Sequence, residues 1–294
     1  MHGRIPNIVD PFNALQSIKL ARREARSERT VVRLRNGAGF GGDVLAVCAG
    51  PCAVESRDQI ETVAAAVARA GANVLRGGAF KPRTSPYAFQ GLGIKGLELL
   101  RAAADRHGLA VVTEVLDPRD VKAVAGYADM LQIGARNMQN FALLRAAGES
   151  GVPVLLKRGI AATVDEWLLA AEYVLVAGNA QVVLCERGIR SFDPATRNLI
   201  DVSVVPLLAE LTHLPVIVDP SHGTGLARLV EPMALAGVAA GADGVMVEVH
   251  PDPPSAASDG QQSITPEQFA TLMTRLGAVA SAVGRRLPAA TLAA

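Results

Sequence analysis

Short apolar runs rich in valine, isoleucine and leucine alternate along the chain with longer segments rich in alanine and leucine. The short runs end in glycine, proline or polar residues, which is typical of strands in a parallel sheet joined by crossover helices. Runs such as VVLC and PVIV are apolar throughout, as expected for strands buried on both faces. The pattern predicts eight strands, at Val44–Ala49, Asn73–Gly77, Ala110–Val115, Met130–Gly134, Pro153–Lys157, Gln181–Glu186, Pro215–Asp219 and Gly244–Val249.

A helix is predicted after each strand. Two of these helices begin at recognisable caps, because Thr163 precedes two acidic residues and Thr265 precedes Pro266 and Glu267. Eight strand–helix units favour an α/β fold of the (β/α)8 TIM barrel type, and an open doubly wound sheet is the alternative. The predicted helices are Arg57–Ala70, Ile94–Arg106, Pro118–Ala125, Asn140–Glu149, Val164–Ala177, Ser203–Leu211, Leu226–Ala240 and Pro266–Val283.

The chain ahead of the first barrel strand has a pattern of its own. It predicts a helix at Phe12–Ser27 and a strand at Thr30–Arg35, followed by a hairpin through the glycines from Gly37 to Gly42 that plugs the bottom of the barrel. We therefore divide the chain into an N-terminal extension at 1–43, a catalytic barrel at 44–285 and a flexible tail at 286–294.

Composition limits the classes of function that fit. The 294 residues carry 29 Lys plus Arg against 28 Asp plus Glu, so the net charge of +1 gives no general attraction to nucleic acid or to an anionic membrane. The chain has three cysteines, a small and odd number that argues against a disulfide framework. The first residues lack the apolar core of a secretion signal. The most apolar stretch, Trp167–Cys185, is interrupted by polar residues. These features predict a cytoplasmic protein.

Polar residues gather where the predicted strands end, which is the end of a barrel that carries the active site. The loops at the opposite ends are short and read HG, GYA, GESG and GNA. This asymmetry predicts one polar face. The candidates, in strand order, are Cys52, Glu55, Arg76, Lys81, Arg83, Thr84, Glu114, Asp117, Gln132, Arg136, Lys157, Arg158, Glu186, Arg187, Asp219, Ser221, His222, Glu248, His250, Asp252 and Asp259.

The segment RGGAFKPRTSP, at 76–86, places Arg76, Lys81 and Arg83 beside the hydroxyl groups of Thr84 and Ser85. Guanidinium groups fit carboxylate and phosphate oxygens bidentately, and a lysine ammonium is a compact charge that can also move a proton. A solvated surface loop is the alternative for this segment taken alone. Its position after the second predicted strand favours an anion site.

Cys52, His222, Glu248 and Asp259 form a candidate metal set. A thiolate, an imidazole and two carboxylates suit a divalent ion such as Mn, Fe, Co or Zn. No local ligand spacing supports the set, which depends on closure of the barrel to bring the first, seventh and eighth strands together. Cys48 and Cys185 lie within strand runs and are interpreted as core residues, and His250 is either catalytic or exposed.

Eight motifs occur in unbroken order between about residue 30 and about residue 283, and together they resemble the 3-deoxy-D-arabino-heptulosonate 7-phosphate (DAHP) synthases. That family comprises metal-dependent barrel enzymes, which condense phosphoenolpyruvate with erythrose 4-phosphate at the start of the shikimate pathway. The motifs are AGPCAVES (49–56), RGGAFKPRTSP (76–86), QIGARNMQN (132–140), LKRG (156–159), CERG (185–188), DPSHGTG (219–225), VEVHPDP (247–253) and SDGQQSI (258–264).

The resemblance implies a role for each matching residue. It implies one divalent metal ion on Cys52, His222, Glu248 and Asp259, and a proton-delivering Lys81, with Glu186 and His222 as weaker candidates for managing the proton of water. The implied phosphoenolpyruvate residues are Arg76, Lys81, Arg136, Lys157 and Arg187, with Gln132, Ala135 and Asp219 beside them, and the implied sugar phosphate residues are Arg83, Thr84 and Ser85.

The sequence leaves several functions open. The 3-deoxy-D-manno-octulosonate 8-phosphate synthases share the barrel, but their loop resembles KANRSS where this chain has KPRTS. A variant using an amino sugar phosphate, a Schiff-base aldolase at Lys157 and a catalytically silent scaffold also stay open. The extension is too short for a regulatory domain of usual size, so we expect little direct inhibition by aromatic amino acids. Control through a partner such as chorismate mutase is compatible with this expectation. The expected assembly is a homodimer or homotetramer.

Overall fold

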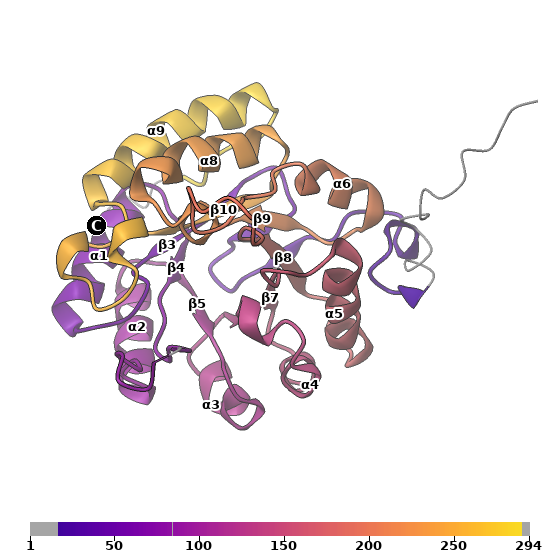
Figure 1. Ribbon diagram of the computed structural model, residues 1–294, viewed down its shortest axis with the longest axis horizontal. Helices are drawn as coiled ribbons and strands as arrows, with labels where there is room; N and C mark the ends of the chain where they lie inside the picture. The colour runs from indigo at the N-terminus through magenta and orange to yellow at the C-terminus, as the bar shows by residue number, and fades with distance from the viewer. Residues whose placement is uncertain (1–16, 84, 290–294) are drawn as a thin grey trace, which may run out of the picture.

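Within the residues that the computed structural model describes, 17–83 and 85–289, eight parallel strands close into a barrel with helices around it (Figure 1). The closed order is β10-β3-β4-β5-β6-β7-β8-β9, which confirms the predicted (β/α)8 barrel and rules out the open sheet. The strands are β3 (Ala46–Gly50), β4 (Val74–Arg76), β5 (Ala110–Glu114), β6 (Met130–Ile133), β7 (Val154–Lys157), β8 (Val182–Glu186), β9 (Val216–Val218) and β10 (Gly244–Glu248).

The long helices follow the strands as predicted, and their boundaries differ from the prediction by a few residues at most. Thr163 and Thr265 each form a capping box with the residue three positions later, Glu166 and Gln268. The helices are α1 (Arg57–Arg69), α2 (Ile94–Arg106), α3 (Val121–Ala125) after a 3-10 turn at Pro118–Asp120, α4 (Phe141–Glu149), α5 (Val164–Val176), α6 (Val204–Leu211), α8 (Ala227–Ala239) and α9 (Pro266–Ala282). No helix in the described ranges is long and apolar enough to cross a membrane.

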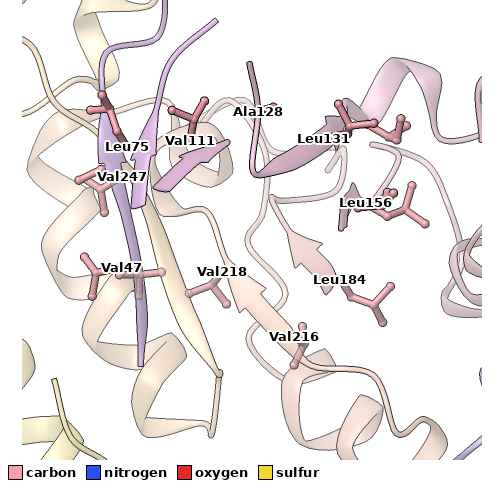
Figure 2. Packing of buried hydrophobic residues seen from close by; sticks show 14 of the residues in the cluster. Val47, Leu75, Val111, Ala128, Leu131, Leu156, Leu184, Val216, Val218 and Val247 are labelled. Carbon is pink, nitrogen blue, oxygen red and sulfur yellow. The ribbon is translucent and has the colours of Figure 1, made fainter. Parts of the chain in front are cut away.

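The apolar core has two layers, because successive strand residues point to opposite faces. One layer lies between the strands and the helices and includes Val47, Leu75 and Val247, which Figure 2 shows among their neighbours. The other fills the inside of the barrel and includes Cys48 and Cys185, both fully buried. The prediction that these two cysteines are core residues is confirmed.

The N-terminal hairpin plugs the barrel as predicted. Its strands, β1 (Val32–Arg33) and β2 (Gly39–Phe40), pair antiparallel, and Val32 lies opposite Phe40. Val32 and Phe40 belong to the cluster inside the barrel, where they meet the first residues of several strands, such as Ala46. The hairpin therefore closes the amino end of the barrel and leaves the carboxyl end for the site.

The predicted helix at Phe12–Ser27 is wrong over its described part, which has no α-helix and instead forms a 3-10 turn at Arg23–Ala25. Residues 12–16 lie outside the described residues. Tertiary contacts account for the difference. The backbone N–H groups of Lys19 and Ala21 donate to the Glu172 carboxylate on α5, at 2.9 and 2.6 Å. Partners supplied by the barrel replace the hydrogen bonds that a helix would make within itself.

Candidate active site

A cavity of about 520 Å³ lies at the carboxyl ends of the barrel strands. Among the described residues, eight lysine and arginine side chains line it, together with the two acidic residues Glu114 and Asp259. Such a surplus of positive charge in a concave site favours anionic ligands. The cations are Arg76, Lys81, Arg83, Arg136, Lys157, Arg187, Arg190 and Arg197.

Most of the residues proposed for substrate binding line this cavity. Asp219 is fully buried and does not line it, and Thr84 lies outside the described residues. The residues brought together are Arg76, Lys81, Arg83, Ser85, Gln132, Ala135, Arg136, Lys157 and Arg187.

Three polar residues around the cavity were missed by the sequence reasoning. Arg190, Arg197 and Asn198 belong to the segment between β8 and α6, which reads RGIRSFDPATRNLIDVS. The segment is 17 residues long, from 187 to 203. Its length could have indicated these residues, because long loops on the active face of a barrel commonly carry functional residues.

Cys52, His222, Glu248 and Asp259 meet in one place. Their candidate ligand atoms all lie within 4.8 Å of one another. Barrel closure explains this convergence, since β10 pairs with both β3 and β9. Cys52 follows β3, His222 follows β9, and Glu248 ends β10.

A short helix that the sequence analysis did not predict positions His222. It is α7 (Pro220–Thr224), and the Asp219 carboxylate caps it by accepting from the His222 backbone N–H at 3.0 Å. The other carboxylate oxygen lies 2.8 Å from His222 Nδ1 and therefore holds a proton on that nitrogen. This leaves the Nε2 lone pair free to bind a metal, 3.4 Å from Glu248 Oε1.

Burial and neighbouring charges shift the pKa of the Cys52 thiol upward and the pKa values of the two carboxyl groups, Glu248 and Asp259, downward. Burial raises the pKa of the Cys52 thiol to about 12. Burial also disfavours an ionised carboxylate, but the positive charges of His222, when it is protonated, and of Arg76 outweigh burial and lower the pKa of Glu248. For Asp259 the same balance lowers the pKa to about 2, with His222 as the main opposing cause. The set thus holds two carboxylates and a thiol that ionises when a cation replaces its proton.

This donor set fits a divalent metal ion. A thiol, an imidazole nitrogen and two carboxylates from four separate segments converge, and soft and hard donors together suit Mn, Fe, Co or Zn. Glu248 is fully buried, a costly position for a carboxylate unless cations compensate it. Arg76 provides part of that compensation, at 3.0 Å from Glu248 Oε1.

Cys52, His222, Glu248 and Asp259 form a metal-type cluster, and Lys81 lies between it and the cavity. Its ammonium group donates to the Cys52 carbonyl at 3.0 Å and lies 2.9 Å from Cys52 Sγ. Gly78 makes this approach feasible, because a Cβ at position 78 would lie 2.8 Å from both the Cys52 carbonyl oxygen and Lys81 Cδ. A larger residue at 78 would therefore displace the lysine.

Lys157 and Glu186 are both committed to buried ion pairs. Lys157 Nζ lies 2.5 Å from Asp219 Oδ2, a pairing that suits poorly the free neutral amine that a Schiff base requires. Glu186 is fully buried, pairs with Arg158 at 3.1 Å and accepts from the Gly188 N–H at 2.6 Å. Its carboxylate does not line the cavity, so the geometry gives no support to a role in handling water.

His250 is buried rather than exposed. Its Nε2 lies 3.4 Å from Glu55, and its Nδ1 accepts from the Asp252 N–H. It does not line the cavity.

Comparisons with known proteins agree with this geometry. The model of the DAHP synthetase I family matches residues 29–283. The chain is 51% identical over 270 residues to phospho-2-dehydro-3-deoxyheptonate aldolase of Thermotoga maritima, covering 92% of this chain and 80% of that protein. A 2-dehydro-3-deoxyphosphooctonate aldolase of a Bradyrhizobium strain is 35% identical over 256 residues, covering 81% of this chain and 89% of its own.

Two solved structures from Thermotoga maritima are also similar. A crystal structure of phospho-2-dehydro-3-deoxyheptonate aldolase (DAHP synthase) superposes with a TM-score of 0.90 at 50% identity, over 92% of this chain and 79% of that one. A truncated 3-deoxy-D-arabino-heptulosonate 7-phosphate synthase gives 0.85 at 47% identity, over 91% and 98%. The chain belongs to the DAHP synthetase I family.

Proposed function

We propose that the protein condenses phosphoenolpyruvate with D-erythrose 4-phosphate and water to give DAHP and phosphate, as a transferase of the shikimate pathway. The observation that carries the proposal is a cavity with eight cationic side chains beside a four-residue metal-type cluster. Two phosphates and a carboxylate must enter this cavity together, and the cations offset their mutual repulsion. The 51% identity to the Thermotoga maritima aldolase, against 35% to the octulosonate enzyme, favours erythrose 4-phosphate as the acceptor.

Different parts of the cavity hold the two substrates in this proposal. Phosphoenolpyruvate lies among the cations at the ends of β4, β6, β7 and β8, namely Arg76, Arg136, Lys157 and Arg187, with Lys81, Gln132 and Ala135 beside it. The sugar phosphate lies against Arg83 and Ser85, and Thr84, which is outside the described residues, is proposed to bind it as well. The Arg83 guanidinium donates to Ser258 Oγ at 2.5 Å, which fixes it beside the metal-type cluster.

The reaction forms one carbon–carbon bond. C3 of phosphoenolpyruvate attacks the aldehyde carbon, and the aldehyde oxygen, on becoming an alkoxide, takes a proton from Lys81. Water adds to C2, and the bond between C2 and the phosphate oxygen breaks, so that C2 becomes a ketone whose oxygen comes from water. Of the two protons that water loses, one restores the ammonium of Lys81 and the other neutralises the departing phosphate. Lys81 is well placed for its step, since it is nearly buried and its ammonium lies 2.9 Å from Cys52 Sγ.

Cys52, His222, Glu248 and Asp259 would hold the divalent ion, which would supply Lewis-acid polarisation of the aldehyde carbonyl. The chain's contribution is to present the four ligands: Asp219 sets the tautomer of His222, and Arg76 compensates the charge on Glu248. The predicted homodimer or homotetramer and the chorismate mutase partner stay predictions, and light scattering on the purified protein tests the first.

A product assay tests the proposal. The purified protein is offered phosphoenolpyruvate with either erythrose 4-phosphate or arabinose 5-phosphate, with EDTA and again after Mn²⁺ is restored. We expect DAHP from the four-carbon sugar, loss with EDTA and recovery with Mn²⁺. Preference for arabinose 5-phosphate would assign the octulosonate reaction instead. Activity in EDTA together with borohydride trapping would support the Schiff-base alternative.

Two cysteine variants distinguish the loss of a metal ligand from the loss of a buried core side chain. Cys52→Ala is expected to lose most activity and metal binding, whereas Cys48→Ala, in the barrel interior, serves as the matched control. Wild-type activity in Cys52→Ala would refute the assigned ligand.

A further inference from the structure

Gln262 has a position that the proposed reaction does not explain. It is fully buried, and it bridges the metal-type cluster and the cavity wall. Its amide nitrogen donates to Glu248 Oε2 at 2.7 Å, and its amide oxygen accepts from Arg197 Nη1 at 2.7 Å. A buried amide with both ends engaged has one well-defined orientation.

Arg197 fixes which way this amide points. A guanidinium has donors and no acceptor, so the group facing it must be the amide oxygen. The NH₂ group must then face Glu248, which as a carboxylate only accepts. Reversing the amide would break both hydrogen bonds and leave a buried carboxylate oxygen without a partner.

The bond from Gln262 determines what Glu248 offers to a cation. With Oε2 engaged by Gln262, the oxygen on the ligand side is Oε1, 3.4 Å from His222 Nε2. Arg76 also approaches Oε1, at 3.0 Å. Gln262 thus presents Glu248 to a cation through a single oxygen.

Arg197 also reaches a second candidate ligand. Its Nη1 lies 3.4 Å from Asp259 Oδ1, and Asp259 has a positive φ of 54°, unique among the described non-glycine residues. A strained backbone persists where surrounding contacts hold it. The same guanidinium therefore holds Asp259 directly and Glu248 through Gln262.

The backbone of Arg197 is itself anchored to the helix that carries His222. The Arg197 N–H donates to the Thr224 carbonyl at 2.9 Å. Gly225 leaves room for this contact, because a Cβ there would lie 2.5 Å from Arg197 Cβ, and its φ of +72° favours glycine. The arginine therefore has a fixed place relative to three of the four ligands.

We propose that Gln262 and Arg197 are positioning residues that orient Glu248 and Asp259 for the divalent ion. The inference rests on the proposed metal site and adds to it the residues outside the ligand set that determine its affinity. Partners that orient metal ligands typically change metal affinity about 10- to 100-fold when removed.

The test measures Mn²⁺ binding without substrate, by calorimetry or chelator competition, in the wild-type protein and in Gln262→Met. Methionine keeps the length of the side chain and removes both hydrogen bonds. We expect the dissociation constant for Mn²⁺ to rise about 10- to 100-fold. Gln261→Met, at the exposed neighbouring glutamine, is the matched control and should leave it unchanged.

Two further measurements separate positioning from a structural role. The melting temperature in EDTA reports the fold alone, and the visible spectrum of the Co²⁺-loaded protein reports ligand geometry. We expect Gln262→Met to change the spectrum and the affinity by more than its loss of stability explains. Arg197→Met, at a partly exposed position, serves if Gln262→Met does not fold, and should weaken Mn²⁺ binding in the same direction.

The outcomes distinguish this inference from the proposed function. If the wild-type protein binds no divalent ion, the proposed metal site fails and the inference fails with it. If the wild type binds Mn²⁺ and both folded variants bind it equally well, only the positioning role is refuted.

Discussion

Arg76 and Glu248 form a buried ion pair beside the metal-type cluster, and replacing Arg76 with methionine removes one member of the pair. The exposed fractions of the two side chains are 5% and 0%, so solvent screens the charge of this pair only weakly. Arg76 Nη1 also donates to the Pro51 carbonyl at 2.7 Å. Methionine retains most of the apolar stem, so the change is mainly one of charge and hydrogen bonding.

The loss of stability expected for Arg76→Met follows from the burial of the pair and depends on whether a divalent ion is bound. Removing one partner of a buried ion pair costs about 3–5 kcal/mol, because the remaining charge is left uncompensated. That cost applies in EDTA. A divalent ion compensates Glu248 by itself, and Arg76 lies 3.0 Å from the oxygen, Oε1, that would bind it. The variant should therefore bind the cation more tightly than wild type and recover about 1.4 kcal/mol of stability for each tenfold gain in affinity.

Unfolding in guanidinium chloride measures the stability lost without metal when EDTA is present, and the stability recovered on cation binding when Mn²⁺ is saturating. We expect Arg76→Met to be less stable than wild type by about 3–5 kcal/mol in EDTA and by clearly less with Mn²⁺. Its activity should be low in both cases, since the guanidinium is assigned to phosphoenolpyruvate. Arg228→Met, at an exposed position on α8, is the matched control. An equal difference in stability with and without Mn²⁺ would refute the argument that Arg76 and the cation share Glu248.

Three further predictions concern other parts of the molecule. Gly78→Ala places a methyl group 2.8 Å from the Cys52 carbonyl oxygen and from Lys81 Cδ, so kcat should fall while the circular dichroism spectrum stays unchanged; full activity would contradict the assigned position of Lys81. Phe40→Ala opens the plug in the barrel and should reduce the free energy of unfolding by about 3–5 kcal/mol in chemical denaturation; a loss below about 1 kcal/mol would show that the hairpin contributes little to the core. Burial opposes ionisation of Asp129, but a backbone N–H and two arginines lower its pKa, so the stability it contributes is present above its unfolded pKa and is lost as the pH falls through the lower folded value. Melting curves in acid should accordingly show a weaker pH dependence for Asp129→Asn, and an unchanged dependence would contradict this account.

The barrel could be predicted from the sequence because its strands are buried on both faces. Uninterrupted apolar runs such as Val182–Cys185 are too short for a buried helix and therefore indicate buried strands. The helices between them begin at caps such as Thr163. The segment before the barrel has no such constraint. Glu172, far along the chain on α5, binds the backbone at Lys19 and Ala21, a contact that local pattern cannot reveal.

Some site residues could likewise be predicted from the sequence and others could not. Residues at strand ends, such as Arg76 and Glu248, could be predicted because barrel closure brings the carboxyl ends of all strands to one face. Arg197 could not be predicted, since it lies ten residues beyond Arg187, within a loop whose path depends on tertiary contacts. The path becomes clear only in three dimensions, where the Arg197 N–H binds the end of α7.

The short helix α7 shows why the chemistry of this site depends on residues that lie outside the cavity. Asp219 makes three contacts there: it caps the helix, orients the His222 ring and pairs with Lys157. A change at Asp219 would therefore alter a metal-type ligand and a cavity cation together, although its own side chain is fully buried. Because one carboxylate couples the two, the geometry of the metal-type cluster and the charge that faces the substrates are not independent, and variants on either side should show non-additive effects on kcat/KM.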